Sequence, residues 1–365
     1  MRQYNYYTKI AFPFATVNSI LCKENLKNRE TPDDGLKINE IMCTIVFFLI
    51  KFSPTGGESM TVSRRHFLKT SFQAAAIGAC FAGGSGQRLP WKAALAEEKG
   101  QAEKRAKWTC SSVNYSTLSL EDACKRISSR GYEAIDIWDS IEGYLTCPHL
   151  QSIAEQYHAD GLAELLQKYK LDLCGFTVYM AKYPKYAELL GQCGGGIAIR
   201  GTRSRVTDRS ITQDVKAFLE ELKPELELCE KYDSYLAVEN HSGDTLLNEI
   251  DSFKAFVDLN PHPRLGIALA PYHILHNKES VAEAIRLCKN RLLFIYLWIN
   301  EPGEKQMPGV GSVDTASWFD ALKEIRYSRF LTPFMHDHPA PDRMDELHCI
   351  SLNYLKKQYY TANRQ

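Results

Sequence analysis

The stretch LGIALAPYH, residues 265–273, is a short apolar run that ends on a proline and then presents a histidine. A continuous apolar run of this length is typical of a strand with both faces buried. The residues that follow, KESVAEAIRLCK at 278–289, repeat apolar side chains at helical spacing. This part of the chain therefore predicts one buried strand followed by one helix.

The same strand-then-helix unit recurs along the chain. The expected strands cover residues 108–115, 133–139, 171–179, 195–201, 234–240, 264–270, 291–299 and 329–337, and a helix follows each of them. The helix after the fourth strand is expected as one long element at 211–232. Eight such units in about 255 residues are typical of an α/β fold, the closed (β/α)8 TIM barrel. We therefore expect a single barrel domain over residues 108–360.

The alternative to a barrel is a doubly wound sheet. That fold would need a glycine-rich phosphate loop after the first strand, and SSVNYST at 111–117 contains no glycine. Lysine plus arginine and aspartate plus glutamate balance at 44 each, so the net charge does not favour a nucleic-acid partner. The 11 cysteines form no C-x-x-C pair, which gives no support to a zinc ribbon or a thioredoxin-like site. Cys147 and Cys193 are candidates for a disulfide in an oxidising compartment.

The segment before the barrel has the composition of an export signal. A basic stretch begins with SRRHFLK at 63–69, a mildly apolar run follows at 71–84, and an A-x-A sequence stands at 94–96. The segment resembles a twin-arginine (Tat) signal peptide, whose S/T-R-R-x-F-L-K pattern it matches at every fixed position. We assign residues 60–96 to this signal, with cleavage after Ala96, and expect a periplasmic or otherwise exported protein that uses the Tat machinery. The alternatives are an uncleaved anchor and a basic amphipathic helix with an incidental arginine pair.

The residues around this signal are interpreted from the same pattern. Residues 97–107 are charged and are expected to form a flexible linker. Met60 directly precedes the signal, so residues 1–59 are interpreted as an over-extended reading or a disordered leader. The apolar run at 41–50 is too short to span a bilayer comfortably, and no stable membrane span is expected after cleavage. The sequence leaves open whether the protein forms a homo-oligomer.

Polar side chains stand where the expected strands end, and in a barrel these ends meet at one catalytic rim. The candidate metal ligands are Glu239, His273, His336 and His338, a carboxylate and imidazole set that suits a divalent cation. The candidate catalytic residues are Glu239, His336 and Asp136. Candidate substrate-binding residues are Trp138, Tyr179, Arg200, Asn240, His241, Tyr272 and Trp298.

Each of these candidates has a structural alternative. Glu239 is either functional or a buried carboxylate paired with Arg200, and His273 is either functional or a rim histidine that caps a loop. Because Asp136 and Trp138 stand at alternate positions, we expect only one of them to point inward. The aromatic residues form either a sugar-stacking wall or ordinary barrel packing. The arginines of IRGTRSR, residues 199–205, either meet a carboxylate or phosphate or lie in a solvated loop.

The chain resembles the xylose isomerase-like TIM barrels, the superfamily of sugar-phosphate isomerases and epimerases and of endonuclease IV. The likeness covers about residues 108–340. It rests on YEAIDIWD at 132–139, YAELLGQCGGGIAIRG at 186–201, YLAVENHSG at 235–243 and RLGIALAPYHI at 264–274. In family members with isomerase or epimerase activity, a divalent cation is held by Glu at strand five, Asp at strand six, His near strand seven and Glu at strand eight.

Carrying that ligand set over to this chain gives a mixed result. Glu239 matches the strand-five ligand, whereas Ala270 takes the position of the strand-six aspartate, three residues before the matching His273. Strand seven offers Tyr296 and Trp298 with no histidine, and His336 stands where glutamate is expected. The resemblance therefore implies either a site with softer ligands, suited to Zn, Mn or Fe, or a site without metal.

Two functions follow from this resemblance. The first is an exported sugar or sugar-phosphate isomerase or epimerase that removes a proton next to a carbonyl, with a small carbohydrate as substrate. The alternative is a non-catalytic carbohydrate-binding barrel with a degenerate metal site. A nuclease function is disfavoured, because the balanced charge and the export signal do not suit DNA.

Overall fold

The computed structural model of the chain describes residues 105–364. The expectations for residues 1–59, for the signal at 60–96 and for most of the linker at 97–107 lie outside this range. No helix of the described residues is long and apolar enough to cross a membrane. All eight described cysteines are free thiols, so the candidate pair Cys147 and Cys193, both buried, forms no disulfide in this structure.

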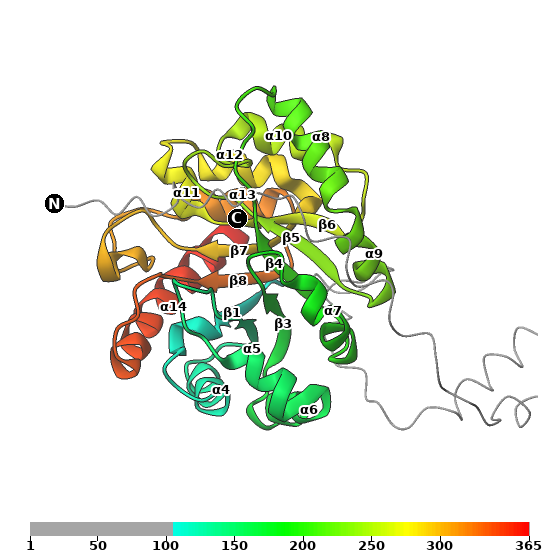
Figure 1. Cartoon of the computed structure of the whole chain (residues 1–365). Helices are drawn as coiled ribbons and strands as arrows, with labels where there is room; N and C mark the ends of the chain where they lie inside the picture. Colours follow the sequence, from blue (N-terminus) through cyan, green and yellow to red (C-terminus); the bar gives the residue numbers. More distant parts are fainter. Residues whose placement is uncertain (1–104, 365) are drawn as a thin grey trace, which may run out of the picture. The chain divides into compact units, whose positions relative to one another are not determined.

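Eight parallel strands form a closed barrel in chain order, with helices around it (Figure 1). The strands are β1 (Lys107–Ser111), β2 (Ala134–Trp138), β3 (Asp172–Thr177), β4 (Ile197–Gly201), β5 (Tyr235–Glu239), β6 (Leu265–Leu269), β7 (Leu292–Leu297) and β8 (Phe330–Pro333). The (β/α)8 prediction is confirmed, and each observed strand falls within its expected range, except that β1 begins one residue earlier.

The helices also follow the expected order, with three differences. They are α4 (Leu120–Ser129), α5 (His149–Ser152), α6 (His158–Tyr169), α7 (Tyr183–Gln192), α8 (Ile211–Glu221), α9 (Lys223–Lys231), α10 (Ile250–Leu259), α11 (Pro271–His276), α12 (Val281–Cys288), α13 (Ala316–Glu324) and α14 (Pro341–Arg364). The expected single helix at 211–232 is two helices, because Pro224 cannot donate a backbone hydrogen bond and lies in the first turn of α9. The short helices α5 and α11 were not predicted, and α11 starts at Pro271.

Short turns of other helix types complete the chain. They are η1 (Ser112–Tyr115), η2 (Ile153–Tyr157), η3 (Lys289–Arg291) and η4 (Gly303–Gln306). Gly266, in the middle of β6, allows β7 to lie close by: a Cβ at this position would come within 2.3 Å of the Arg291 carbonyl oxygen and 2.5 Å of Leu293 Cγ. The glycine of LGIALAPYH therefore helps to close the barrel.

The last helix is fixed to the first strand by a buried histidine. His348 of α14 is fully buried, and its Nδ1 lies 2.6 Å from the hydroxyl of Tyr132. Its Nε2 lies 3.0 Å from Asn114 Nδ2 and 3.6 Å from Cys110 Sγ. Burial lowers the pKa of His348 to about 3, so the imidazole is neutral at physiological pH. This cluster packs the chain's end against β1.

Candidate functional site

Asp136 lies on β2 inside the barrel and is fully buried. Its carboxylate accepts hydrogen bonds from Ser111 Oγ at 2.8 Å, Thr177 Oγ1 at 2.8 Å and Trp138 Nε1 at 2.6 Å. Burial raises its pKa to about 6, and the three donors limit that rise. The expectation that only one of Asp136 and Trp138 points inward is wrong, because residues two apart on a strand share a face.

Glu239 is the last residue of β5 and is only 7% exposed. Its Oε2 accepts a hydrogen bond from the hydroxyl of Tyr179, which follows β3. Burial raises the pKa of Glu239 to about 8; the Tyr179 hydroxyl opposes this rise, and the charge of Asp136 adds to it. A carboxyl group with a pKa near neutrality both accepts and returns a proton at physiological pH. The alternative pairing of Glu239 with Arg200 does not occur.

Hydroxyl groups occupy the space between the two carboxyl groups. Thr177 Oγ1 lies within hydrogen-bond distance of both Asp136 and the hydroxyl of Tyr296, the latter at 3.0 Å. Burial holds the pKa of Tyr296 and of Tyr179 well above its usual value, so both phenols stay protonated. Tyr296 and Thr177 were not among the candidate site residues, because a tyrosine in an apolar strand also suits ordinary core packing.

An aromatic cluster lies at the same end of the barrel. Trp138 stacks on Phe334 with ring centroids 5.5 Å apart, and Tyr272 stacks on Trp298 at 4.1 Å. Phe334 also meets the edge of Trp298 at 5.4 Å, and Tyr179 meets Trp138 at 5.4 Å. The four expected aromatic residues are therefore brought together, with Phe334 as the link that the sequence did not single out.

Two histidines stack on each other beside this cluster. The rings of His241 and His273 have centroids 3.9 Å apart and an interplanar angle of 33°. His273 Nδ1 lies 3.0 Å from Ser242 Oγ, and His241 Nδ1 lies 2.8 Å from the Ser242 carbonyl oxygen. Burial lowers the pKa of both imidazoles, that of His273 strongly. Both rings are therefore neutral at physiological pH.

His336 and His338 follow β8 and differ in their surroundings. The ring of His336 meets the edge of Trp298 with centroids 4.8 Å apart, and burial lowers its pKa to about 4. His338 is exposed. The backbone N–H of His336 donates to Gln306 Oε1 at 2.9 Å, which ties the loop after β8 to η4. His336 therefore belongs to the aromatic cluster, whereas His338 lies at its margin.

Asn240 and Ala270 form a backbone clamp at the ends of β5 and β6. Asn240 Oδ1 accepts a hydrogen bond from Ala270 N at 2.6 Å, and Asn240 Nδ2 donates to Ala270 O at 3.1 Å. Asn240 is only 1% exposed, and the Ala270 methyl group is fully buried. The side chain predicted to bind substrate is thus already engaged by both its oxygen and its nitrogen, and it fixes the strand end where the resemblance implies an aspartate.

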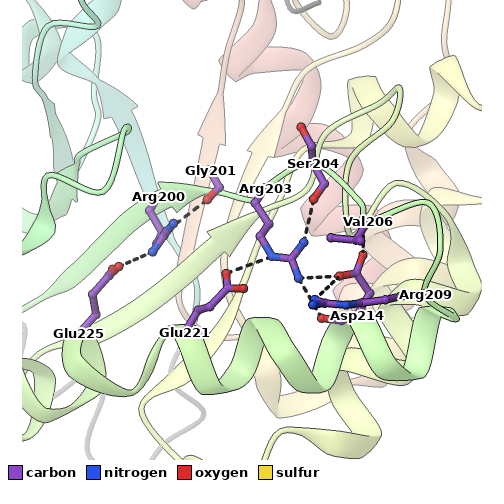
Figure 2. Close-up of polar contacts among 9 residues, drawn as sticks. All are labelled: Arg200, Gly201, Arg203, Ser204, Val206, Arg209, Asp214, Glu221 and Glu225. Atoms are coloured by element: carbon purple, nitrogen blue, oxygen red, sulfur yellow. Dashed lines mark hydrogen bonds and ion pairs between the residues drawn. The ribbon is translucent and has the colours of Figure 1, made fainter. Parts of the chain in front are cut away.

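Arg200 lies outside the rim cluster. It stands next to the inward-facing Ile199, so its side chain points to the helical layer, where it pairs with Glu225 of α9 (Figure 2). Arg203 and Arg209 pair with the buried Asp214 of α8 (Figure 2), and Arg203 also contacts Glu221 at 3.1 Å. Arg205 pairs with Glu249 at 3.2 Å. These arginines therefore meet the chain's own carboxylates.

The residues at the rim do not fit the metal site implied by the resemblance. Glu239 Oε2 is engaged by Tyr179, Ala270 offers a methyl group, and the indole of Trp298 touches both His273 and His336. Among residues 105–364, no three histidine, cysteine, aspartate or glutamate side chains are grouped so as to hold a metal ion. The predicted ligands Glu239, His273, His336 and His338 are thus not assembled as a coordination sphere.

The comparisons with known proteins agree with this fold. A family model described as "Xylose isomerase-like TIM barrel" matches residues 124–351. No curated protein sequence matches the chain.

Similar solved structures share the barrel at low sequence identity. D-allulose 3-epimerase from Methylomonas sp. is 17% identical with a TM-score of 0.55, over 70% of this chain and 98% of its own. The 3-keto-D-glucoside 4-epimerase YcjR from E. coli is 13% identical with a TM-score of 0.55, over 69% of this chain and 100% of its own. The IOLI protein, solved with a zinc atom, is 14% identical with a TM-score of 0.56, over 70% of this chain and 99% of its own. At such identities the likeness concerns the fold alone.

Proposed function

The chain belongs to the xylose isomerase-like TIM barrel family, and from that premise we propose that it is a sugar isomerase or epimerase that moves a proton next to a carbonyl. The observation that carries this proposal is Glu239, a carboxyl group at the rim with a pKa of about 8. In its ionised form Glu239 removes the proton from the hydroxyl-bearing carbon beside the sugar carbonyl. In its protonated form it delivers the proton to the former carbonyl carbon, while the hydroxyl proton passes to the former carbonyl oxygen, so that the carbonyl moves to the neighbouring carbon. The Tyr179 hydroxyl stabilises the ionised form by its hydrogen bond.

The aromatic cluster supports a carbohydrate as ligand. The flat apolar faces of the rim suit the C–H face of a sugar ring, and the polar groups among them suit its hydroxyls. Structural neighbours include an epimerase of D-allulose, a D-tagatose 3-epimerase-like protein and an L-ribulose 3-epimerase. Ketoses of this kind, free or phosphorylated, are therefore the first substrates to test.

Proton exchange with solvent tests the proposed reaction. The chain is incubated in D2O with D-allulose, D-tagatose, L-ribulose and their phosphates, and deuterium at the carbon beside the carbonyl is followed by NMR. We expect exchange, and a loss of about 100-fold or more on Glu239→Gln, because the amide cannot accept the proton. The matched control Glu142→Gln alters an exposed carboxylate in the loop after β2 and should leave the rate unchanged. Equal rates for Glu239→Gln and the unaltered chain would exclude Glu239 as the base.

A carbohydrate-binding barrel without catalysis is the second candidate. Ala270 at the end of β6 and the stacked rings Trp298 and Tyr272 favour it, because they provide contact surface without chemistry. Binding of a ketose in isothermal titration calorimetry, together with no deuterium incorporation, would select this function over the isomerase.

Export through the Tat pathway is proposed on the sequence alone. Replacing Arg64 and Arg65 by lysine in the full chain should retain the protein in the cytoplasm, because the Tat machinery recognises its signal peptides by this arginine pair. Fractionation of cells that express either the unaltered chain or the variant measures how much of each protein lies outside the cytoplasm. Equal amounts of the two versions outside the cytoplasm would contradict the proposal.

A further inference from the structure

The two rim tryptophans differ in what their indole N–H groups meet. Trp138 donates its N–H to Asp136 at 2.6 Å. Trp298, directly after β7, is only 1% exposed, and its Nε1 has no hydrogen-bond partner among the described residues. A buried N–H without an acceptor is unfavourable, and native proteins rarely leave one. The Trp298 N–H is therefore a donor without an acceptor in the middle of the candidate site.

The neighbours of Trp298 are side chains of the rim. Its ring stacks on Tyr272 at 4.1 Å and meets the edges of His273 at 5.4 Å and His336 at 4.8 Å. His273 Nδ1 is already engaged with Ser242 Oγ. Tyr272 is half-buried and covers one face of the indole, which leaves the N–H at the ring edge. An oxygen atom of a bound ligand would supply the acceptor that the Trp298 N–H lacks.

The same place lacks the groups that would hold a cation. Ala270 gives a methyl group at the end of β6, and Trp298 itself stands between His273 and His336. A neutral N–H donor in a buried site stabilises negative charge on a nearby oxygen, which is one of the roles a metal ion plays.

We propose that Trp298 Nε1 donates a hydrogen bond to an oxygen of the bound sugar, and that sugar binding at this rim requires no metal ion. This inference rests on the proposed function, since it concerns the same ligand. It makes Trp298 a ligand-binding residue and assigns the contact with the sugar oxygen to a neutral indole.

Isothermal titration calorimetry with the same ketose panel tests the proposal. The purified full chain is first dialysed against EDTA, and its metal content is measured by mass spectrometry. We expect the unaltered chain to keep its affinity after dialysis, and Trp298→Phe to lose about 10-fold in affinity, because phenylalanine keeps an aromatic ring but has no N–H. Trp318→Phe, a buried tryptophan of α13 in the helical layer, is the matched control and should bind as the unaltered chain does.

A second measurement follows the indole N–H of the unaltered chain, so its result does not depend on the stability of a variant. In chain labelled with ¹⁵N at tryptophan, the indole N–H resonance of Trp298 should shift downfield when sugar is added, and the resonance missing from Trp298→Phe identifies it. An unshifted resonance under saturating sugar, or affinity lost with the metal and restored by Zn²⁺ or Mn²⁺, would overturn the inference and leave the proposed function intact. If no ketose of the panel binds with or without metal, both the inference and the proposed function fail.

Discussion

Two opposing influences act on the Glu239 carboxyl group. Removal from water favours its neutral form, whereas the hydrogen bond from Tyr179 favours its ionised form. Their balance leaves a pKa of about 8, which suits a group that must exist in both forms during one reaction. Asp136 differs in its surroundings: it is fully buried, and its hydrogen bonds with Ser111, Thr177 and Trp138 hold those three side chains in place.

Substituting Tyr179 tests this balance. Tyr179→Phe removes the donor to Glu239, so the pKa of Glu239 should rise above about 8 and the ionised fraction at pH 7 should fall. We expect deuterium exchange to slow by about 10-fold at pH 7 and its pH profile to shift toward higher pH. Tyr169→Phe also removes a tyrosine-to-glutamate hydrogen bond, to Glu121 near the surface, and serves as the control. An unchanged pH profile for Tyr179→Phe would show that Tyr179 does not tune the base.

At the scale of elements, the apolar runs of the sequence located every strand, because parallel strands buried on both faces contain few polar residues. They did not show which side chains point inward. That Asp136 and Trp138 share a face follows from their spacing of two residues. Which face points inward, and that Arg200 points outward beside Ile199, depends on the strand register. Phe334 and Trp298 meet only because β7 and β8 are neighbours, which no local pattern reveals.

Ion pairs hold the loop between β4 and α8. From the sequence alone, the arginines of this loop were candidates either for ligand binding or for a solvated loop. Asp214 is fully buried and accepts from Arg203 Nη2 at 2.5 Å and from Val206 N at 3.0 Å (Figure 2). Asp214→Asn should lower the free energy of unfolding by about 2 kcal/mol, because the amide weakens a charged hydrogen bond and brings its own N–H toward these donors. Urea unfolding measures this.

Sugar affinity separates this structural role from ligand binding. Asp214→Asn should leave the affinity for the ketose panel unchanged, since the network faces the helical layer. The control Asp258→Asn removes an exposed pair with Lys254 and should change stability by less than about 0.5 kcal/mol. A selective loss of affinity for sugar phosphates in Asp214→Asn would instead indicate that these arginines serve the ligand.

On the scale of the whole molecule, buried neutral histidines make the barrel sensitive to acid. Burial lowers the pKa of six histidines, namely His149, His241, His273, His336, His338 and His348. In the unfolded chain these groups titrate near pH 6.5, so below that pH the unfolded state binds more protons and the free energy of unfolding falls. The raised pKa values of Glu239 and Asp136 act in the opposite direction, because there the folded state holds the proton. Lowering the pH from 7.5 to 5.5 therefore removes the part of the stability that these neutral histidines contribute.

His348 isolates one contribution to this loss, since its pKa of about 3 keeps it neutral in the folded state across the whole interval. A group of this kind contributes about 1.4 kcal/mol to the difference in unfolding free energy between pH 7.5 and 5.5. His348→Asn should reduce that difference by about this amount, whatever the variant loses in stability at both pH values through its smaller side chain. Urea unfolding at the two pH values measures the difference, and His158→Asn, at an exposed position, should leave it unchanged. If the difference were as large in His348→Asn as in the unaltered chain, the cluster joining α14 to β1 would not be a source of the acid sensitivity.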